Sequence, residues 1–357
     1  MYIHFPFCRS KCAYCSFIST PNTDLQNNYF SRLETEIESF GEKVEINTIY
    51  FGGGTPSVVD RGIITKIKRA IDEKFILRND YEFTVECNPE SVTDEFCNEI
   101  ASVGVNRVSI GLQSANNEIL KSIGRVHTVE QFIQAVEKIK SYGITNISGD
   151  LILGLPNQDK TDIKTAIEIF DRLDLTHISV YALSVEEGTP LYRSGYRPDD
   201  DFQADLYDYA VELLAKNGYE RYEVSNFARS GKISRHNYKY WVGADYYGFG
   251  VSAHSLVKGV RYENAPTLEE YLANPLDKKA LPLSKNDMRE EKIMLALRTS
   301  DGLDLAEYKT LYGDLAIEKS DQIAKLKSSG LIEIDGDKLR ATAKGFYLLN
   351  TIITELI

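Results

Sequence analysis

The sequence predicts an α/β fold, an open or partial (β/α)6 barrel that is followed by a smaller α+β domain. Three observations lead to this prediction. From Met1 to Tyr222, short β-branched runs alternate about six times with longer amphipathic runs, which is the pattern of a parallel sheet with helical connections. Six such units are fewer than the eight that close a full barrel. Beyond Tyr222 the alternation ends and a different pattern begins.

The first region, residues 1–222, contains the repeated unit. Runs rich in Ile, Val, Tyr and Phe predict the strands, and apolar residues at helical spacing predict the helices between them. The expected strands are Tyr2–Phe5, Asn47–Phe51, Glu82–Cys87, Arg107–Ile110, Ile147–Leu153 and His177–Ala182. The expected helices are Leu25–Phe40, Arg61–Lys74, Thr93–Val103, Thr128–Tyr142, Lys160–Leu173 and Phe202–Asn217.

Polar and glycine residues gather at the carboxyl ends of these strands. In chain order they are Gly52-Gly53-Gly54-Thr55-Pro56, Glu86 with Asn88, Ser109 with Gln113, Asp150, and Tyr181–Ser184. In α/β barrels the loops at this end vary while the strands hold them rigidly, so sites are built there. We therefore expect the functional site at this end.

Two further regions follow. Residues 223–283 are rich in Tyr, Gly, Asn and His and predict an irregular connecting region, with strand-like pieces near Gly248–Leu256. Residues 284–357 predict helices and then a hairpin that turns at Asp335-Gly336, as in a winged-helix-like domain. From residue 285 to the end, eleven Lys and Arg stand against thirteen Asp and Glu. This domain lacks the basic surface of a DNA-binding module, so we expect it to pack or to contact protein.

Composition and charge exclude several classes of protein. The hydrophobic content of 43% is enough for a large core, and the net charge of −12 argues against general nucleic-acid binding. No apolar run is long enough for a membrane span, and no secretory signal is recognisable. We expect a cytoplasmic protein with reduced thiols. Without a basic amphipathic helix, direct membrane anchoring is not predicted, while docking on a membrane partner stays open.

Three cysteines near the start, Cys8, Cys12 and Cys15, read C-x3-C-x2-C. A closed zinc site would need a fourth ligand close by, and three is an odd number for disulfides. Three thiolates suit a 4Fe-4S cluster whose fourth iron is open to a ligand that is not protein. A loose metal-binding loop or buried free thiols are the alternatives.

The cysteines follow Tyr2-x-His4-x-Pro6-Phe7, and the motif ends at Phe17. This arrangement resembles the cluster motif of the radical S-adenosylmethionine (SAM) enzymes. More narrowly, the chain resembles the oxygen-independent coproporphyrinogen III oxidase family along nearly its whole length. The resemblance implies the partial barrel, a 4Fe-4S cluster on the three cysteines, and SAM chelated to the open iron.

By the same resemblance, SAM contacts fall on Tyr2, Gly53, Gly54, Thr55, Glu86, Gln113, Arg125, Asp150 and Ala182. The glycines let the main chain approach the SAM amino group. Arg125 can hold the carboxylate with a bidentate fork, and acidic side chains suit the ribose hydroxyls. Tyr2 carries over as a neighbour of the sulfonium, and Ala182 as a main-chain contact to adenine. Asp150 as a buried strand-end carboxylate and Arg125 as a surface ion pair are the alternatives.

Four other residues have less specific interpretations. His4 lies beside the cluster loop and is a candidate catalytic residue, or it only packs there. His127 lies two residues after Arg125, and its role is likewise undecided. Cys87 and Cys97 are most simply buried small hydrophobic residues.

Two features separate the branches of the family. Coproporphyrinogen oxidases of this type carry a fourth cysteine two residues after the third and a leading segment; here Phe17 takes that position and only Met1 precedes Tyr2. The run His236-Asn-Tyr-Lys-Tyr-Trp241 matches the H-N-x-x-Y-W signature of the haem chaperone branch, HemW. An imidazole can ligate haem iron, and aromatic rings can cover a porphyrin. His236 is the first haem candidate and His254 the second, with packing or hydrogen bonding as the alternative role.

We therefore expect a haem chaperone of the radical SAM type, which binds haem and delivers it to respiratory acceptor proteins. The alternative is an enzyme of porphyrin metabolism that catalyses the SAM-dependent oxidative decarboxylation of coproporphyrinogen III. Whether the chain is an enzyme stays open, because Phe17 replaces the fourth cysteine. A third hypothesis is an interaction module with the cluster as a regulatory switch. Both a monomer and a homodimer are compatible with the sequence.

Overall fold

The computed structural model describes residues 1–41 and 43–357 of the chain. Its first part contains β1 (Tyr2–Phe5), α1 (Gln26–Glu38), β2 (Glu45–Gly53), α2 (Ile63–Lys74), β3 (Ile76–Cys87), α3 (Asp94–Ser102), β4 (Arg107–Gln113), α4 (Asn117–Ser122), α5 (Val129–Ser141), β5 (Ile147–Leu153), α6 (Lys160–Arg172), β6 (His177–Ala182), α7 (Pro190–Arg193) and α8 (Asp200–Lys216). All six predicted strands and all six predicted helices of this part are present. The short helices α4 and α7 were not predicted, because four to six residues carry too little periodicity to recognise.

The middle and last parts follow in the chain. The middle part contains β7 (Glu220–Arg221), β8 (Asn226–Ala228), α9 (Arg235–Trp241), β9 (Gly248–Phe249), β10 (His254–Val257), β11 (Val260–Asn264), α10 (Leu268–Ala273) and β12 (Lys278–Pro282). The last part contains α11 (Lys285–Ala296), β13 (Leu303–Asp304), α12 (Leu305–Tyr312), α13 (Leu315–Glu318), α14 (Ser320–Ser328), β14 (Ile332–Asp335), β15 (Lys338–Ala341), α15 (Ala343–Phe346) and α16 (Leu349–Leu356). Among the described helices, none is both long and apolar enough to cross a membrane.

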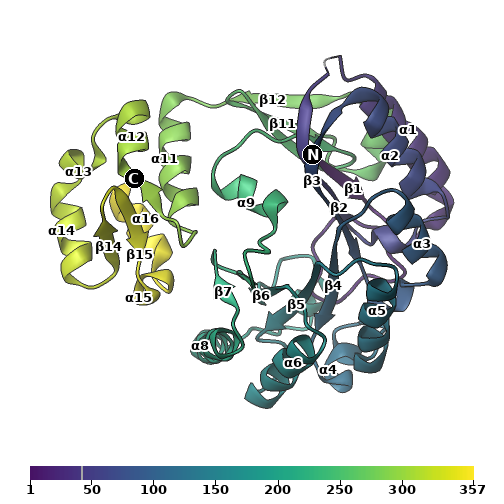
Figure 1. Ribbon diagram of the computed structural model, residues 1–357, viewed down its shortest axis with the longest axis horizontal. Helices are drawn as coiled ribbons and strands as arrows, with labels where there is room; N and C mark the ends of the chain where they lie inside the picture. Colours follow the sequence, from purple (N-terminus) through teal and green to yellow (C-terminus); the bar gives the residue numbers. More distant parts are fainter. Residues whose placement is uncertain (42) are drawn as a thin grey trace.

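A nine-stranded sheet forms the centre of the molecule, in the order β7-β8-β6-β5-β4-β3-β2-β1-β9. Strands β1 to β6 are parallel neighbours in sequence order, and β8 joins β6 antiparallel. The helices of the repeated units cover the outer face of the sheet (Figure 1). Because β1 and β6 pair with β9 and β8 and not with each other, the barrel is open, as the six predicted units indicate.

Strand β4 shows why the sheet has an apolar outer face and a polar inner one. Val108, Ile110 and Leu112 are fully buried in the main hydrophobic core that the helices complete. Arg107 and Ser109 alternate with them and point to the other side, since successive side chains of a strand point to opposite faces. The inner face of this open barrel is therefore rich in polar groups, which positions a site within it.

The middle part is more ordered than the irregular connecting region that composition predicts. β9 pairs in parallel with β1, and β10, β11 and β12 form an antiparallel sheet of their own. The buried carboxylate of Glu36 on α1 ties this part to the barrel, because it accepts hydrogen bonds from Gly250 N, Asn264 Nδ2 and Tyr271 OH and pairs with Lys278. Strands of two residues that pair with distant partners leave little trace in composition.

The last part has its own hydrophobic core and a small sheet in the order β13-β15-β14. Four helices, α11 to α14, precede the β14–β15 hairpin, and Asp335 pairs with Lys338 across its turn. Helix, short strand, helices and hairpin is the order of a winged-helix-like domain, as predicted. Figure 1 shows this domain on one side of the molecule, with α9 between α11 and the large sheet.

Candidate functional site

A cavity of about 370 Å³ opens at the carboxyl ends of the parallel strands. All three motif cysteines line it. So do eight of the nine residues predicted to contact SAM: Gly53, Gly54, Thr55, Glu86, Gln113, Arg125, Asp150 and Ala182. The ninth, Tyr2, lies deeper in the barrel on β1. Residues far apart in the sequence therefore converge on one site, because they belong to the strands of one sheet or to the connections that follow those strands.

The loop with the three cysteines is fixed from both sides. Ala13 donates its N–H to the Ile123 carbonyl at 2.8 Å and accepts a hydrogen bond from Leu191 N at 2.9 Å. The short helices α4 and α7 thus hold the loop. Cys8, Cys12 and Cys15 are half-buried free thiols, and Thr55 Oγ1 donates to Cys8 Sγ at 3.3 Å.

The donor set fits a cluster better than a single metal ion. Within residues 1–41 and 43–357, no three His, Cys, Asp or Glu side chains converge as the ligands of one ion would. A 4Fe-4S cluster does not require this convergence, since each thiolate binds a different iron. Burial raises the pKa of the Cys8 and Cys15 thiols, so the thiolates need a compensating positive group.

The glycine segment after β2 is shaped by its neighbours. Gly53 has a φ of +106°, a left-handed conformation that favours glycine, and a Cβ there would lie 2.4 Å from the ring of His4. At Gly54 a Cβ would lie 2.6 Å from the Phe5 carbonyl oxygen. The segment can pass close to β1 only without side chains, and this exposes its main chain to the cavity.

Two carboxylates line the cavity, Glu86 on β3 and Asp150 on β5. Tyr50 OH donates to Glu86 Oε1 at 2.5 Å, and Gly53 N donates to Glu86 Oε2 at 3.1 Å. Ser109 Oγ donates to Asp150 Oδ1 at 3.2 Å. Burial, and then the charge of Glu86, raise the pKa of Asp150 to about 7, and burial also raises the pKa of Glu86. Both carboxylates would be stabilised by a cationic ligand.

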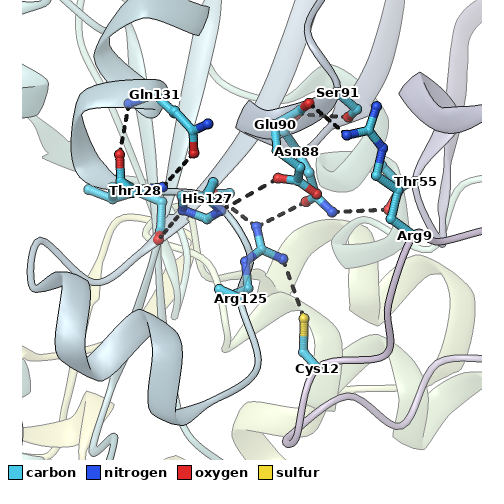
Figure 2. A network of polar contacts seen from close by, with 12 residues as sticks. Arg9, Cys12, Thr55, Asn88, Glu90, Ser91, Arg125, His127, Thr128 and Gln131 are labelled. Carbon is cyan, nitrogen blue, oxygen red and sulfur yellow. Dashed lines mark hydrogen bonds and ion pairs between the residues drawn. The ribbon is translucent and has the colours of Figure 1, made fainter.

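Arg125 lies beside the cysteine loop, where its guanidinium already has protein partners (Figure 2). Nη2 donates to Asn88 Oδ1 at 2.9 Å and to the Gly111 carbonyl at 3.0 Å, and Nη1 lies 3.7 Å from Cys12 Sγ. A bidentate interaction of the guanidinium with the SAM carboxylate, as expected, would have to share these N–H groups with the protein partners. The buried Nε has no hydrogen-bond partner among the described residues and fits an anionic group such as a carboxylate.

Gln113 has a strained backbone at the end of β4. Its φ is +70°, which is uncommon for a residue other than glycine, and the β4–β5 register shifts between Gly111 and Gln113. Such strain is concentrated at binding sites, where the surrounding structure holds it. It turns Gln113 into the lining of the cavity.

Two of the sequence candidates near the site are occupied by structural contacts. His4 is buried, with Nδ1 2.9 Å from Tyr2 OH and Nε2 2.9 Å from the Ile18 carbonyl. His127 is also buried, with Nε2 3.2 Å from the Leu112 carbonyl and Nδ1 3.6 Å from Glu90 Oε2. These contacts give both rings a structural role in the loops around the cavity.

Cys87 and Cys97 are buried in the main core, as predicted. Tyr50, which holds Glu86 from behind the cavity lining, is a residue that sequence reasoning missed. It stands on β2 two residues after Thr48 and two before Gly52, so the alternation of the strand already indicates that it faces the barrel interior.

The two haem candidates have opposite environments. His236 on α9 is 1% exposed; its Nδ1 lies 2.9 Å from Thr48 Oγ1 and its Nε2 2.9 Å from Tyr240 OH. The His254 side chain on β10 is 49% exposed, and its Nε2 lies 3.9 Å from Glu263 Oε1. In this conformation His236 offers no free ring nitrogen to an iron, whereas His254 presents its ring to solvent.

Known families match the chain over most of its length. The Radical SAM superfamily profile matches residues 2–170, and the HemN C-terminal domain profile matches residues 283–348. The protein named heme chaperone HemW of Lactococcus lactis is 38% identical over 100% of this chain and 96% of its own length. The protein of the same name from Bacillus subtilis is 31% identical over 98% of this chain and 97% of its own.

A solved structure shares the fold. Coproporphyrinogen III oxidase (HemN) from Escherichia coli, described as a radical SAM enzyme, superimposes with a TM-score of 0.87. The match covers 99% of this chain and 89% of that one at 23% identity. This confirms the predicted fold, the open barrel with its smaller C-terminal domain.

Proposed function

Because the chain belongs to the radical SAM superfamily and, within it, to the family of the heme chaperone HemW, we propose that it binds haem and passes it to an acceptor protein. The proposed acceptors are respiratory haem proteins, and the proposed location is the cytoplasm. The observation that carries the proposal is the convergence of three thiols and eight predicted SAM contacts on one cavity, in a chain that resembles haem chaperones from end to end.

Each group at the cavity has a proposed role. Cys8, Cys12 and Cys15 would supply the thiolates of a 4Fe-4S cluster, and Arg125 would place a positive charge beside them. The main chain of the glycine segment would receive the SAM amino group, and Glu86 would accept from the ribose. When bound, the cluster would supply one-electron reduction and SAM a sulfonium next to it. We propose no reaction of SAM for this chain.

We propose His254 as the first iron ligand to test and His236 as the second. His254 shares one face of its sheet with Leu256 and Lys279, since residues two apart on a strand and cross-strand partners point to the same side. This face offers an imidazole for iron and an apolar side chain for the porphyrin. Lys279 could meet a propionate only after it leaves Glu263 on the same face, whose Oε2 lies 3.3 Å from its Nζ. His236 could reach iron only after it leaves Thr48 and Tyr240.

The decarboxylase alternative is less well supported. Full-length relatives at 31–38% identity are named heme chaperones, whereas the coproporphyrinogen oxidase match at 23% identity concerns the fold. Phe17, at the position of the expected fourth cysteine, lines the cavity and is 64% exposed. An apolar ring at this rim cannot supply the thiol that coproporphyrinogen oxidases of this type carry at this position.

The test is a titration of haem into the purified protein, followed by its Soret absorbance. We expect saturable binding near one haem per chain, weakened about tenfold or more by His254→Ala. The matched control Glu269→Ala, on the exposed side of α10, should bind as the native chain does. Weakening by His236→Ala alone would move the ligand to α9. Absence of saturable binding would overturn the proposal, and anaerobic coproporphyrinogen III decarboxylation would then be assayed.

A further inference from the structure

A column of aromatic rings runs through the barrel from the SAM pocket to α9. Tyr2 and Tyr50 are stacked, with ring centroids 6.1 Å apart and planes at 28°. Tyr50 and His236 are stacked more closely, at 5.0 Å and 26°. Tyr240 meets His236 edge-on at 5.3 Å, and Tyr246 meets Tyr240 edge-on at 4.7 Å. The histidine of the H-N-x-x-Y-W motif is thus the middle member of a continuous column.

The contacts of His236 fix its ring against β2. Thr48 and Tyr50, two residues apart on the same face of β2, contact its edge and its face respectively. The backbone N–H of His236 donates to Glu82 Oε1 at 3.0 Å, which anchors the start of α9 to β3. The ring has no freedom to turn without breaking a hydrogen bond at each nitrogen.

Tyr50 links His236 to the SAM pocket. Its hydroxyl donates to Glu86, whose other carboxylate oxygen receives the N–H of Gly53. A Cβ at Gly52 would lie 2.7 Å from Cε1 of Tyr50 and 2.8 Å from Cδ of Glu86, so both side chains pack directly on the glycine segment. The phenol ring is held between this segment, Tyr2 and His236. Removal of the imidazole would leave one face of the phenol uncovered, and its bond to Glu86 would loosen.

We propose that His236 is a positioning residue of the SAM pocket, acting through Tyr50 on Glu86. The inference rests on the SAM binding proposed above. It assigns the histidine of the motif a role inside the barrel, at the end of α9 that faces β2, and leaves iron ligation to an accessible imidazole. Because coupling is reciprocal, bound SAM should in turn stabilise α9 in its place.

The test compares SAM affinities of the holoprotein, with its cluster reconstituted without oxygen, by calorimetry. Tyr50→Phe keeps the stacking and removes the donor to Glu86, and we expect affinity to fall about tenfold. His236→Ala should lower affinity at least about threefold in the native background. In the Tyr50→Phe background it should change affinity less than about twofold, because its path to Glu86 is already broken. Losses that multiply in the double variant would overturn the inference.

A matched control separates positioning from general loosening of the fold. His177 is also fully buried, with Nδ1 2.7 Å from Ser148 Oγ and Nε2 2.8 Å from Tyr222 OH, but its hydrogen bonds and its ring contact go to these residues and not to Tyr50. His177→Ala should therefore reduce SAM affinity less than His236→Ala does. If His177→Ala lowered SAM affinity as much as His236→Ala or more, the loss of any buried imidazole would have the same effect, and the inference would fail.

A second variant covers the case in which His236→Ala does not fold. His236→Phe keeps a ring over Tyr50 and loses only the hydrogen bonds, so SAM affinity should stay within about twofold of native; a tenfold loss would overturn the inference. Two failures are distinguishable. A native holoprotein that binds no SAM removes the proposed SAM site and this inference with it. Native binding that His236→Ala leaves unchanged removes this inference alone.

Discussion

The cysteine loop and helix α9 each carry a sequence motif, but they present it in opposite ways. Cys8, Cys12 and Cys15 are half-buried and line an open cavity without disulfide partners. His236 of the H-N-x-x-Y-W motif is enclosed and has a hydrogen bond at each ring nitrogen. By our proposals, the first motif would provide cluster ligands, and the second would support a neighbouring site. Side chains typical of metal sites do not bind metal unless the fold leaves their donor atoms free.

The largest expected effect concerns the ligand motif. Cys12→Ser removes one of three thiolates, and we expect the reconstituted protein to lose nearly all of its cluster, because a hydroxyl is a poor replacement for a thiolate. Iron content and the visible absorbance of the cluster measure this. Cys97→Ser, in the core, is the control and should retain iron. If the Cys12→Ser variant kept a full cluster, Cys12 would not be a cluster ligand, and the proposed difference between the two motifs would be contradicted.

A second large effect concerns the glycine segment between the motifs. Gly54→Ala would place a methyl group 2.6 Å from the Phe5 carbonyl oxygen and 2.7 Å from the Phe7 carbonyl oxygen. Backbone atoms cannot move aside easily, so we expect ~2–3 kcal/mol less stability in urea unfolding and a loss of SAM binding. Gly41→Ala meets no atom within 4 Å and is the matched control. Equal stabilities would contradict the close approach of the segment to β1.

A third effect compares the two haem candidates directly. His236→Ala removes two hydrogen bonds and leaves a void among buried rings, so we expect the free energy of unfolding to fall by ~2–4 kcal/mol. His254→Ala, at a half-exposed position, should change it by less than ~0.5 kcal/mol. Urea unfolding of the two variants measures the difference. Similar values would mean that α9 does not hold its histidine as tightly as the contacts indicate.

The smallest effect is a pH dependence at Asp150. Its pKa is raised from 3.8 to about 7 by burial and by Glu86 on β3, while Arg107 on β4 and the Ser179 and Ser109 hydroxyls oppose the shift. A raised pKa in an acid stabilises the folded protein fully below about pH 3.8, and this contribution is lost as the pH rises through about 7. The affinity for cationic SAM should change in the opposite direction, rising a few-fold between about pH 6 and 8. Asp150→Asn should remove the dependence, and an unchanged slope would exclude Asp150 as its origin.

The fold was largely predictable because its signals are local. The strand Ile147–Leu153 and the helix near Lys160 have the expected composition, spacing and capping residue, since Asp159 caps α6 in a capping box. The pairing of β9 with β1 was not predictable, because it joins residues at opposite ends of the barrel sequence. Two-residue strands are recognised by their partners and not by their own residues.

The site was predictable in its membership but not in its contacts. Eight of nine predicted SAM residues line one cavity, because the strand ends of a parallel sheet and the connections that follow them meet at one edge. The partners of Arg125 depend on where Asn88 and Gly111 lie in space, and the enclosure of His236 depends on Thr48 and Tyr50. Motifs identify residue types, whereas the availability of a donor atom is decided by tertiary packing.

The pairing of β1 with β9 has a consequence for synthesis on the ribosome. Tyr2 and Ile3 pair with Gly248 and Phe249, so the first strand of the sheet stays an open edge until most of the chain has been made. At ~5–20 residues per second this interval lasts on the order of tens of seconds. An uncovered strand edge is a template for wrong pairing with another chain. The nascent protein is therefore most exposed to wrong strand pairing during this interval.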